Sequence, residues 1–342
     1  MFNFKWNLGD GYPAKGINEH KSTVFSTFSC GGGSSMGYKL AGYDVIGAND
    51  IDPQMEKVYK ANHNPKIYLL SDIRGLIEKE LPKELYNLDV LDGSPPCSTF
   101  SMAGSREKAW GKEKVFREGQ SKQVLDDLFF EFITLAKKLQ PKVVIAENVK
   151  GMLMGNAKGY IIEIKKKFIE AGYDCQIFLL NASTMGVPQR RERVFFLCKR
   201  KDLNLPNIKI AFSEKPITIS QAIKDLPDLS TDGKRLTERA ESIWKKVRIG
   251  DCANKVMNGS WFNYTKLNPN RVAPTVTAKG NNLWHWTKPH SISKKYITRI
   301  GSFPDDYNYL DVDSGYLVGM SVPPVMMAQV ANQVYLQWLS KL

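Results

Sequence analysis

The sequence predicts an α/β protein built on a doubly wound, mostly parallel sheet, with a second, smaller and irregular domain. Short apolar runs alternate with helix-like segments over residues 23–199, an order typical of parallel sheets with helical crossovers. Several runs end in glycine or a polar residue, where ligands of such sheets bind. Beyond residue 203 the periodicity weakens and proline, asparagine and tryptophan become frequent. That change indicates a separate and less regular domain.

The expected strands are short apolar runs, several of them closed by aspartate, asparagine or glycine. The expected helices repeat apolar residues at helical spacing, and Pro141 ends the third of them. In chain order, we expect strands at 23–28, 43–48, 66–70, 88–91, 142–146, 174–181 and 193–199, and helices at 34–41, 54–62, 125–139 and 160–171.

The domain boundaries follow from these patterns. A first domain is expected over 20–200, and a second over 203–290. The last stretch, 322–342, reads as a helix opened by prolines at its first turn, and we expect 295–342 to return to the first domain. No internal repeat is visible.

Charge and cysteine content narrow the possible partners. The 342 residues carry a formal charge of +13, which suits a polyanion such as nucleic acid. No apolar run could span a bilayer and no signal peptide is visible, so we expect a cytoplasmic protein with no membrane partner. Five scattered cysteines predict no disulfide framework, and four histidines lack metal spacing, so we expect no metal site.

Cys97 is the strongest candidate for a catalytic residue. It follows the apolar run 88–91 and two prolines, which fix the backbone and supply no N–H. A rigidly held thiol at the end of a parallel strand is well placed for covalent catalysis. Most intracellular cysteines are buried apolar residues instead, but the double proline and the strand-end position favour Cys97 over the other four.

The glycine triplet 31–33 predicts a nucleoside site. It follows the first strand and opens a helix, so its backbone can approach a ligand closely. Asp50 ends the second strand at the spacing that places a carboxylate on ribose hydroxyls, and Asp72 ends the third strand near an adenine edge. No Lys-Ser/Thr pair follows the glycines, which disfavours a nucleoside triphosphate. S-adenosylmethionine fits better, and a nicotinamide dinucleotide stays open at this point.

Strand order then brings the candidate groups together. In a doubly wound sheet the first and fourth strands are neighbours, so the glycine loop and the Cys97 loop face one crevice. Glu147 follows the fifth strand beside Cys97, and an apolar setting favours its protonated, proton-donating form. Arg190, Arg191 and Arg193 precede the last strand, where guanidinium groups can fork onto phosphates or a base carbonyl. An ion-pair network with Glu192 is the equal alternative.

The chain resembles the DNA (cytosine-5) methyltransferases, of bacterial or phage type. The family's motifs occur in order from about residue 24 to 335 and their spacing is highly specific; they are FSTFSCGGGSSMGYKLAGY, ANDIDP, SDI, GSPPCSTFSMAG, ENVKGML, VPQRRERVF, RVAPTVTA, FPDDY and GMSVPP.

The resemblance implies a Rossmann-like, S-adenosylmethionine-dependent enzyme acting on a cytosine turned out of duplex DNA. Cys97 would add to carbon 6, Glu147 would hold or protonate ring nitrogen 3, Arg193 would contact the exocyclic oxygen, and Arg191 completes the expected catalytic set. The 203–290 domain falls where the family carries its target-recognition region, and 101–120 matches a mobile loop expected to close as a lid. The expected cofactor-binding residues are Phe28, Gly32, Gly33, Asp50, Ile51, Asp72, Ile73, Pro96, Ser321 and Val322; the expected substrate-binding residues are Ser101, Gln189, Arg190, Arg271 and Thr275.

The chain departs from the family at four positions. Ser26 replaces an acidic residue, Cys30 a glycine, Ser98 a glutamine and Met320 an asparagine. The resemblance places Cys30 and Met320 beside the cofactor, so these two bear on its affinity.

Several other functions stay open at this stage. One is the same chemistry on structured RNA such as tRNA, another a catalytically silent DNA-binding module, and a third a nicotinamide oxidoreductase. A zinc deaminase would need a second cysteine three residues after Cys97, where Phe100 stands. We expect double-stranded DNA as partner, a monomer, and a cognate restriction endonuclease acting on the same site.

Overall fold

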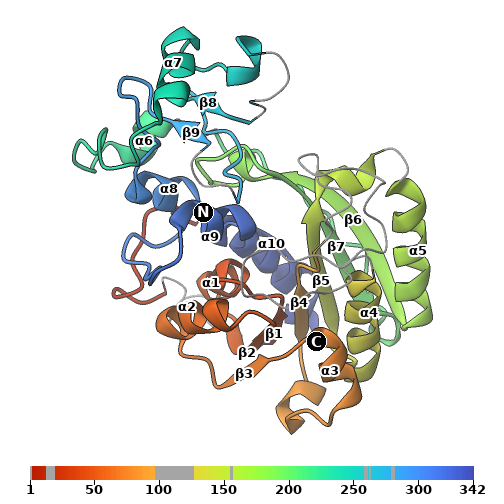
Figure 1. The fold of residues 1–342 in the computed structure, drawn as a ribbon. Helices are drawn as coiled ribbons and strands as arrows, with labels where there is room; N and C mark the ends of the chain where they lie inside the picture. Colours follow the sequence, from red (N-terminus) through yellow and green to blue (C-terminus); the bar gives the residue numbers. More distant parts are fainter. Residues whose placement is uncertain are drawn as a thin grey trace. The chain divides into compact units, whose positions relative to one another are not determined.

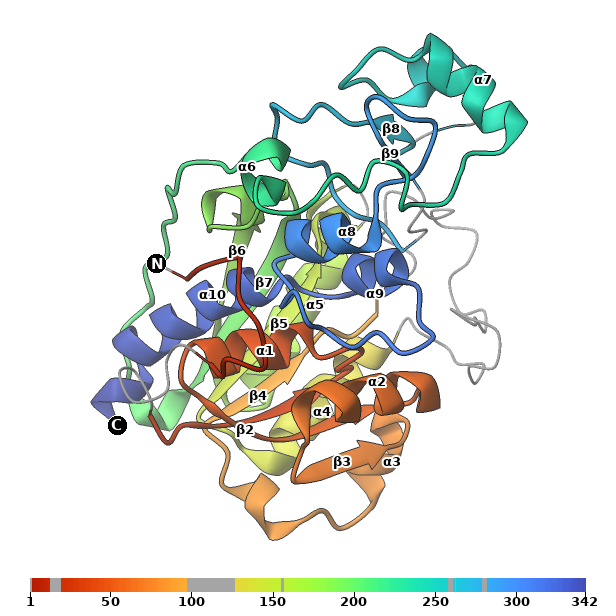
Figure 2. The same cartoon turned by 90° about the vertical axis from the view of Figure 1, so that its left-hand side faces the viewer.

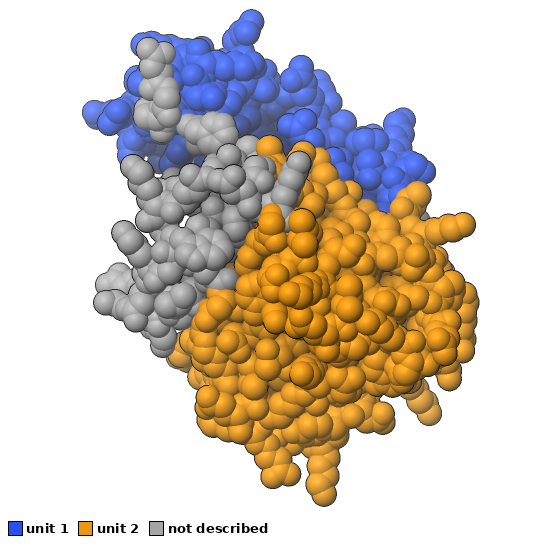
Figure 3. Space-filling view, turned by 90° about the vertical axis from the view of Figure 1, so that its right-hand side faces the viewer, with its two compact units in different colours: residues 1–12, 181–191, 212–327 blue, residues 13–180, 192–211, 328–342 orange. Residues whose placement is uncertain are grey.

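The computed structural model describes residues 2–12, 20–96, 127–154, 157–257, 261, 263–278 and 282–342. Contacts divide the chain into two compact units, which Figure 3 colours separately. Unit 1 comprises 1–12, 181–191 and 212–327, and unit 2 comprises 13–180, 192–211 and 328–342. Each is described by itself below.

Unit 2 is built on a seven-stranded sheet in the order β3-β2-β1-β4-β5-β7-β6 (Figure 1). The pairs from β3 through β5 are parallel, and β7 pairs antiparallel with β5. The predicted doubly wound, mostly parallel sheet is therefore confirmed. The strands are β1 (Thr23–Thr27), β2 (Asp44–Asp50), β3 (Ile67–Leu70), β4 (Val90–Gly93), β5 (Val143–Val149), β6 (Tyr173–Asn181) and β7 (Glu192–Arg200).

Strand β5 runs further than the sequence predicts. The expected strand stops at residue 146, whereas β5 continues through Glu147 to Val149. The extension exists because β7 pairs with β5 over this stretch, with Val149 opposite Arg193 and Glu147 opposite Phe195. Glu147 therefore lies within a paired strand, where its backbone is fixed.

The helices of unit 2 begin at recognisable caps. Asp52 caps α2 by accepting the amide N–H groups of Gln54 and Met55, and Pro53 occupies its first position. Asp72 caps the short helix α3 by accepting from Arg74 N–H. The helices are α1 (Gly33–Leu40), α2 (Pro53–His63), α3 (Ile73–Glu78), α4 (Leu128–Leu139) and α5 (Ala157–Glu170). Unit 2 also includes residues 328–337 of the last helix, α10 (Pro324–Gln337).

Helices cover both faces of this sheet (Figure 1 and Figure 2). Apolar side chains of α3, α4 and α5 bury one face in a continuous core; Phe132, Phe129 and Phe168 are at most 2% exposed. On the other face, α1 packs beside β1 and β2, and Tyr43 donates its hydroxyl to the carbonyl of Ala331 at 2.8 Å. Burial on both faces explains why the central strands are continuous apolar runs.

The structure pairs Cys175 of β6 with Cys198 of β7 in a disulfide. The scattered cysteines predict no disulfide framework, and their spacing could not show this pair, because the cysteines meet only where β6 and β7 lie side by side.

Unit 1 is less regular, with short helices and one two-stranded sheet. Its elements are α6 (Ile219–Ile223), α7 (Glu238–Lys246), β8 (Thr265–Lys266), β9 (Leu283–Trp284), α8 (Lys294–Ile300) and α9 (Ser314–Met320). A small core joins α7 to the sheet through Ile243 and Trp284. The amino-terminal residues 2–12 also belong to it.

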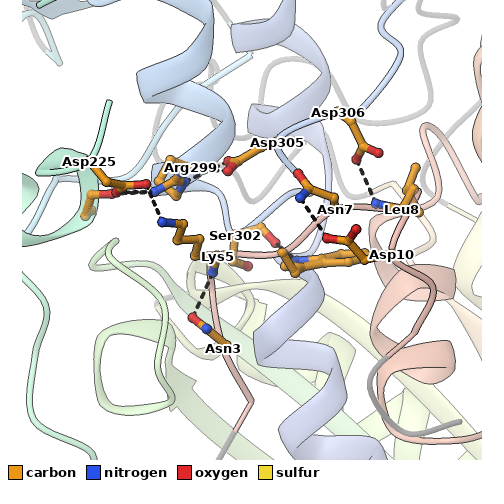
Figure 4. Close-up of polar contacts among 12 residues, drawn as sticks. Asn3, Lys5, Asn7, Leu8, Asp10, Asp225, Arg299, Ser302, Asp305 and Asp306 are labelled. Atoms are coloured by element: carbon orange, nitrogen blue, oxygen red, sulfur yellow. Dashed lines mark hydrogen bonds and ion pairs between the residues drawn. The ribbon is translucent and has the colours of Figure 1, made fainter. Parts of the chain in front are cut away.

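Polar contacts hold the amino-terminal segment to the FPDDY motif within unit 1 (Figure 4). Asp306 accepts the amide N–H groups of Leu8 and Gly9 at 2.7 and 2.9 Å. Lys5 pairs with Asp225, which also pairs with Arg299, and Arg299 donates to Asp305 at 2.7 Å. The ring N–H of Trp6 donates to the carbonyl of Ser302 at 3.0 Å.

The bounds of the contact-based units differ from those of the expected domains. Residues 181–191 and 295–327 group with unit 1, because their hydrogen bonds run to residues 273–276 and to the amino-terminal segment. The units are defined by contacts alone, so the cofactor-binding and target-recognition roles stay predictions. In the described part of the chain, no helix is both long enough and apolar enough to cross a membrane.

Candidate active site

The candidate site of unit 2 is built around the carboxyl ends of β1 and β4. These strands are parallel neighbours, with Ser26 opposite Asp92 and Thr27 opposite Gly93. The loop after β1 holds the glycine triplet, and the loop after β4 leads through Pro95 and Pro96 toward Cys97. The expected adjacency of these two strands is confirmed. Cys97 itself, with Ser98, Ser101 and the expected lid at 101–120, lies outside the described residues.

The loop after β1 turns through an unusual series of left-handed backbone conformations. Phe28, Cys30 and Gly32 have φ values of 52°, 47° and 83°. Only glycine adopts this region without penalty, so Phe28 and Cys30 are held there by their surroundings. At Gly32 a side chain is also excluded by space, because a Cβ would lie 2.0 Å from Nε2 of His63.

Asp50, expected on ribose hydroxyls, fastens this loop. One of its carboxylate oxygens accepts the amide N–H of Cys30 at 2.7 Å, and the other accepts that of Asp52 at 3.0 Å. Burial raises its pKa to about 6, although these amide bonds oppose the rise. A carboxylate has more acceptor positions than these two amides use, so it can still accept from a ligand.

The remaining expected cofactor residues divide between the units. Asp72 caps α3 and pairs with Arg74 at 3.1 Å, while Ile73 is buried. Ile51 and Pro96 are half-buried beside the loops, and Gly33 begins α1. Ser321 and Val322 belong to unit 1, where both are buried and Ser321 donates its hydroxyl to the carbonyl of Leu317.

Glu147 and Arg193 form a buried ion pair, so Glu147 faces a cation and not the apolar setting that the sequence predicts. Nε of Arg193 lies 2.8 Å from a carboxylate oxygen of Glu147, and the two side chains are 14% and 10% exposed. Burial lowers the pKa of Arg193, and the neighbouring carboxylate of Glu147 opposes that shift. Next along β5, the side-chain amide of Asn148 donates to the carbonyl of Pro95 at 3.0 Å. The ENV motif is thus bonded to the loop that precedes Cys97.

Asp92 carries a buried carboxyl group that was not predicted from the sequence. Its two oxygens accept from the hydroxyls of Ser26 at 2.7 Å and Tyr38 at 3.2 Å. Burial raises its pKa to about 7, which these two hydrogen bonds partly oppose and the charge of Glu147 reinforces. Ser26, where the family resemblance implies an acidic residue, thus donates to an acid on the neighbouring strand. Asp92 within LDVLDG was the only sequence signal.

In unit 1, hydrogen bonds join the segments of two motifs that the resemblance implies at the substrate. Gln189 accepts the amide N–H of Val276 at 3.1 Å, and Arg190 N–H donates to the carbonyl of Ala273 at 2.8 Å. The hydroxyl of Thr275 donates to the carbonyl of Arg190 at 2.8 Å. Segments 187–191 and 271–278 therefore form one bonded substructure.

Arg190 and Arg191 have different settings within this substructure. Arg190 is exposed, as is Arg271. Arg191 is 2% exposed, and its terminal nitrogens donate to the carbonyls of Val276 and Gly319 at 2.9 and 2.8 Å. These contacts show that the guanidinium of Arg191 binds two backbone carbonyls. The catalytic role of Arg191 stays a prediction.

Unit 2 has a Rossmann-like fold, in which the loops after β1 and β4 are neighbours and the ion pair of Glu147 and Arg193 joins β5 to β7. A model of the C-5 cytosine-specific DNA methylase family matches residues 22–336. Type II methyltransferase M.FnuDI of Fusobacterium nucleatum is 32% identical over 91% of this chain and 93% of its own. M.NgoPII of Neisseria gonorrhoeae is 30% identical over 91% and 94%.

Solved structures share the fold. One is the DNMT2 of Spodoptera frugiperda, with a TM-score of 0.64 and 17% identity, covering 92% of this chain and 100% of that one. The Dnmt2 methyltransferase of S. pombe gives a TM-score of 0.62 at 15% identity, covering 92% and 98%. The chain belongs to the C-5 cytosine-specific DNA methylase family and is a DNA cytosine-5 methyltransferase.

Proposed function

We propose that the protein transfers a methyl group from S-adenosylmethionine to carbon 5 of a cytosine turned out of a short duplex DNA sequence, through a covalent adduct with Cys97. The observation that carries the proposal is the buried Glu147–Arg193 pair on β5 and β7, with Asn148 bonded to the backbone of Pro95 two residues before Cys97. These contacts support the proposal, because Asn148 follows Glu147 on β5 and its bond ties that strand to the backbone two residues before Cys97.

The groups around the β1 loop support a polar nucleoside as ligand. Asp50 keeps acceptor positions for hydroxyl groups, and Phe28 offers a half-buried ring. Two polar atoms, Oγ of Ser29 and Nε2 of His63, are buried beside the loop. Gly31–Gly33 allow a ligand to approach the backbone. S-adenosylmethionine, when bound, supplies an electrophilic methyl group.

The protein's own groups then act on the cytosine. The thiolate of Cys97 adds to carbon 6, which makes carbon 5 nucleophilic. Glu147 holds or protonates ring nitrogen 3, and Arg193 orients Glu147 and contacts the exocyclic oxygen. Once carbon 5 carries the methyl group and S-adenosylhomocysteine is left, a base removes the proton from carbon 5, the thiolate leaves carbon 6, and ring nitrogen 3 returns any proton to Glu147. The ring is restored and the cysteine is free for the next turnover.

Charge and the motifs of unit 1 support DNA as substrate. The net charge of +13 favours a polyanion. We assign the bonded substructure of 187–191 and 271–278 and the recognition region to DNA, with Gln189, Arg190, Arg271 and Thr275 as contacts. Since the relatives are type II methyltransferases, we infer a cognate restriction endonuclease. We expect a cytoplasmic monomer.

The test supplies labelled S-adenosylmethionine with either duplex DNA or tRNA. Wild type should label DNA only, and Cys97→Ser should lose transfer by more than about a thousandfold. Cys252→Ser is the matched control, because Cys252 is a free, half-buried cysteine of unit 1, and it should keep full activity. Label in tRNA alone would overturn the DNA assignment. Full activity of Cys97→Ser would overturn the covalent mechanism.

A further inference from the structure

His63 is a buried histidine that the proposed mechanism does not use. It is the last residue of α2 and is 7% exposed. Its ring stacks on Tyr59, with centroids 4.3 Å apart and planes at 20°. The hydroxyl of Tyr59 in turn donates to Oγ of Ser35 on α1 at 2.8 Å. The position of the imidazole is therefore set by both α1 and α2.

Lys39 of α1 selects the orientation of the ring. Its Nζ donates to the backbone carbonyl of His63 at 3.1 Å and lies 3.5 Å from Nδ1. An ammonium group carries donors only, so Nδ1 presents its lone pair and the ring proton resides on Nε2. Burial and then the charge of Lys39 lower the pKa of His63 well below its ordinary value. The imidazole is neutral at pH 7.

The opposite edge of the ring lies directly beneath the glycine turn. A Cβ built on Gly32 would lie 2.0 Å from Nε2 and 2.6 Å from Cδ2 of His63, so the imidazole occupies the space that a side chain would need. Hydrogen bonds with the backbone of Gly31 and Gly32 partly oppose the fall in the pKa of His63, which also places the ring against this turn. The turn above it contains the left-handed residues Cys30 and Gly32.

We propose that His63 is a positioning residue for the cofactor, whose imidazole supports the Gly31–Gly32 turn from below and holds it in the shape that binds S-adenosylmethionine. The inference rests on the proposed function, because it concerns the cofactor crevice. His63 touches no reacting atom. It should therefore set the affinity for the cofactor through the free energy of ordering the turn, and leave the chemical step unchanged at saturation.

Two substitutions distinguish the role of the Nδ1 edge of the imidazole from that of the Nε2 edge. His63→Asn places an amide near the position of Nδ1, which keeps the contact with Lys39 but empties the space below Gly32. His63→Gln reaches the position of Nε2 and refills that space with an N–H donor. The matched control is His20→Asn, because His20 also stacks on an aromatic ring of unit 2, that of Tyr335 at 3.7 Å.

The experiment measures the Kd of S-adenosylhomocysteine by calorimetry without DNA, together with the Kd of DNA, kcat at saturating cofactor and the melting temperature. His63→Asn should raise the cofactor Kd at least about tenfold, with the DNA Kd and kcat within about twofold. His63→Gln should return the Kd to within about threefold of wild type, and His20→Asn should leave it unchanged.

Three outcomes decide the matter. A cofactor Kd within twofold of wild type in folded His63→Asn would overturn the role of His63 and leave the proposed function intact. A loss shared equally by His20→Asn, in step with the melting temperature, would also overturn it, because it would show general destabilisation. Absence of binding by the wild-type protein would instead refute the proposed cofactor.

Discussion

The guanidinium of Arg193 lies 2.8 Å from the carboxylate of Glu147, diagonally across the antiparallel pair of β5 and β7. The two groups come from motifs far apart in the sequence, ENV and QRRER, and both are largely buried. An unpaired buried charge is strongly destabilising, so each of these two residues compensates the buried charge of the other. The pair gives the site a carboxylate whose orientation is fixed before substrate arrives.

Substituting Glu147 should mainly lower activity, whereas substituting Arg193 should mainly lower stability. Glu147→Gln keeps the shape but loses the proton-transferring group, so kcat should fall by about a hundredfold or more with little loss of fold. Arg193→Met leaves a buried carboxylate unpaired and should lower the free energy of unfolding by about 3 kcal/mol. Steady-state kinetics and urea unfolding measure the two effects.

The control for this pair is Lys150→Met. Lys150 pairs with Glu192 at 2.9 Å near the same strands, but both side chains are about 40% exposed. Exposed ion pairs contribute little to stability, so Lys150→Met should change the free energy of unfolding by no more than about 0.5 kcal/mol. Equal destabilisation by Lys150→Met and Arg193→Met would contradict the claim that burial makes the Glu147–Arg193 pair important.

Asp92 should make stability depend on pH. Because burial raises its pKa in the folded state to about 7 from 3.8, the folded state holds a proton that the unfolded state releases between these values. Its contribution to stability is therefore greatest below about pH 4 and is lost as pH rises to about 7. Asp92→Asn removes the charge and keeps an oxygen for Tyr38, so its advantage over wild type should grow from pH 5 to pH 8, by about 2 kcal/mol.

Urea unfolding at the two pH values checks this prediction. Asp44→Asn is the control, because Asp44 begins β2 and is exposed, and it should change stability by no more than about 0.5 kcal/mol at either pH. A difference between Asp92→Asn and wild type that is the same at pH 5 and pH 8 would show that Asp92 carries no buried charge at neutral pH.

Trp6 should anchor the amino-terminal segment to unit 1. It is 7% exposed, and its backbone carbonyl accepts the amide N–H of Asp305 at 2.9 Å. Trp6→Ala leaves a cavity beside Ser302 and should lower the free energy of unfolding by about 3 kcal/mol. Asn3→Ala, an exposed position of the same segment, should change it by less than about 0.5 kcal/mol. Equal melting curves for Trp6→Ala and wild type would mean that the segment does not stabilise unit 1.

The two neighbouring arginines should separate stability from DNA binding. Arg191→Met removes donors from the carbonyls of Val276 and Gly319 and should destabilise the protein by about 2 kcal/mol. Arg190 is exposed, so Arg190→Met should leave melting unchanged and weaken DNA binding with a shallower dependence on salt. The prediction fails if Arg190→Met lowers the melting temperature as much as Arg191→Met, or binds DNA as wild type does.

The central sheet could be predicted because its strands are apolar on both faces and are separated by helices with clear periodicity. All seven strands were expected, within a few residues at their ends. The antiparallel pairing that extends β5 past residue 146 was not visible in the sequence, since it depends on β7. The helices α3 and α6 to α9 and the strands β8 and β9 were missed, because such short elements are determined by tertiary contacts.

Candidate site residues could be predicted where motifs lie at the ends of strands. They could not be predicted where a residue's contacts come from parts of the chain that are distant in sequence. The sequence led to the neighbouring loops after β1 and β4, to Glu147 on the next strand and to Asp50. It did not show that Asp50 accepts the amide N–H groups of Cys30 and Asp52. Asp92 and His63 were missed because their partners, Tyr38 and Gly32, are brought to them only by the packing of α1 against β1, β4 and α2.

The central claim is that Cys97 forms a covalent bond with the target base. Duplex DNA carrying 5-fluorocytosine at the methylated position tests it most directly, since fluorine at carbon 5 prevents release of the cysteine. Incubation with S-adenosylmethionine should give a stable one-to-one protein–DNA adduct that peptide mapping places on Cys97 and that Cys97→Ser cannot form. Continued methylation of ordinary DNA with no adduct, or an adduct on another residue, would contradict the claim.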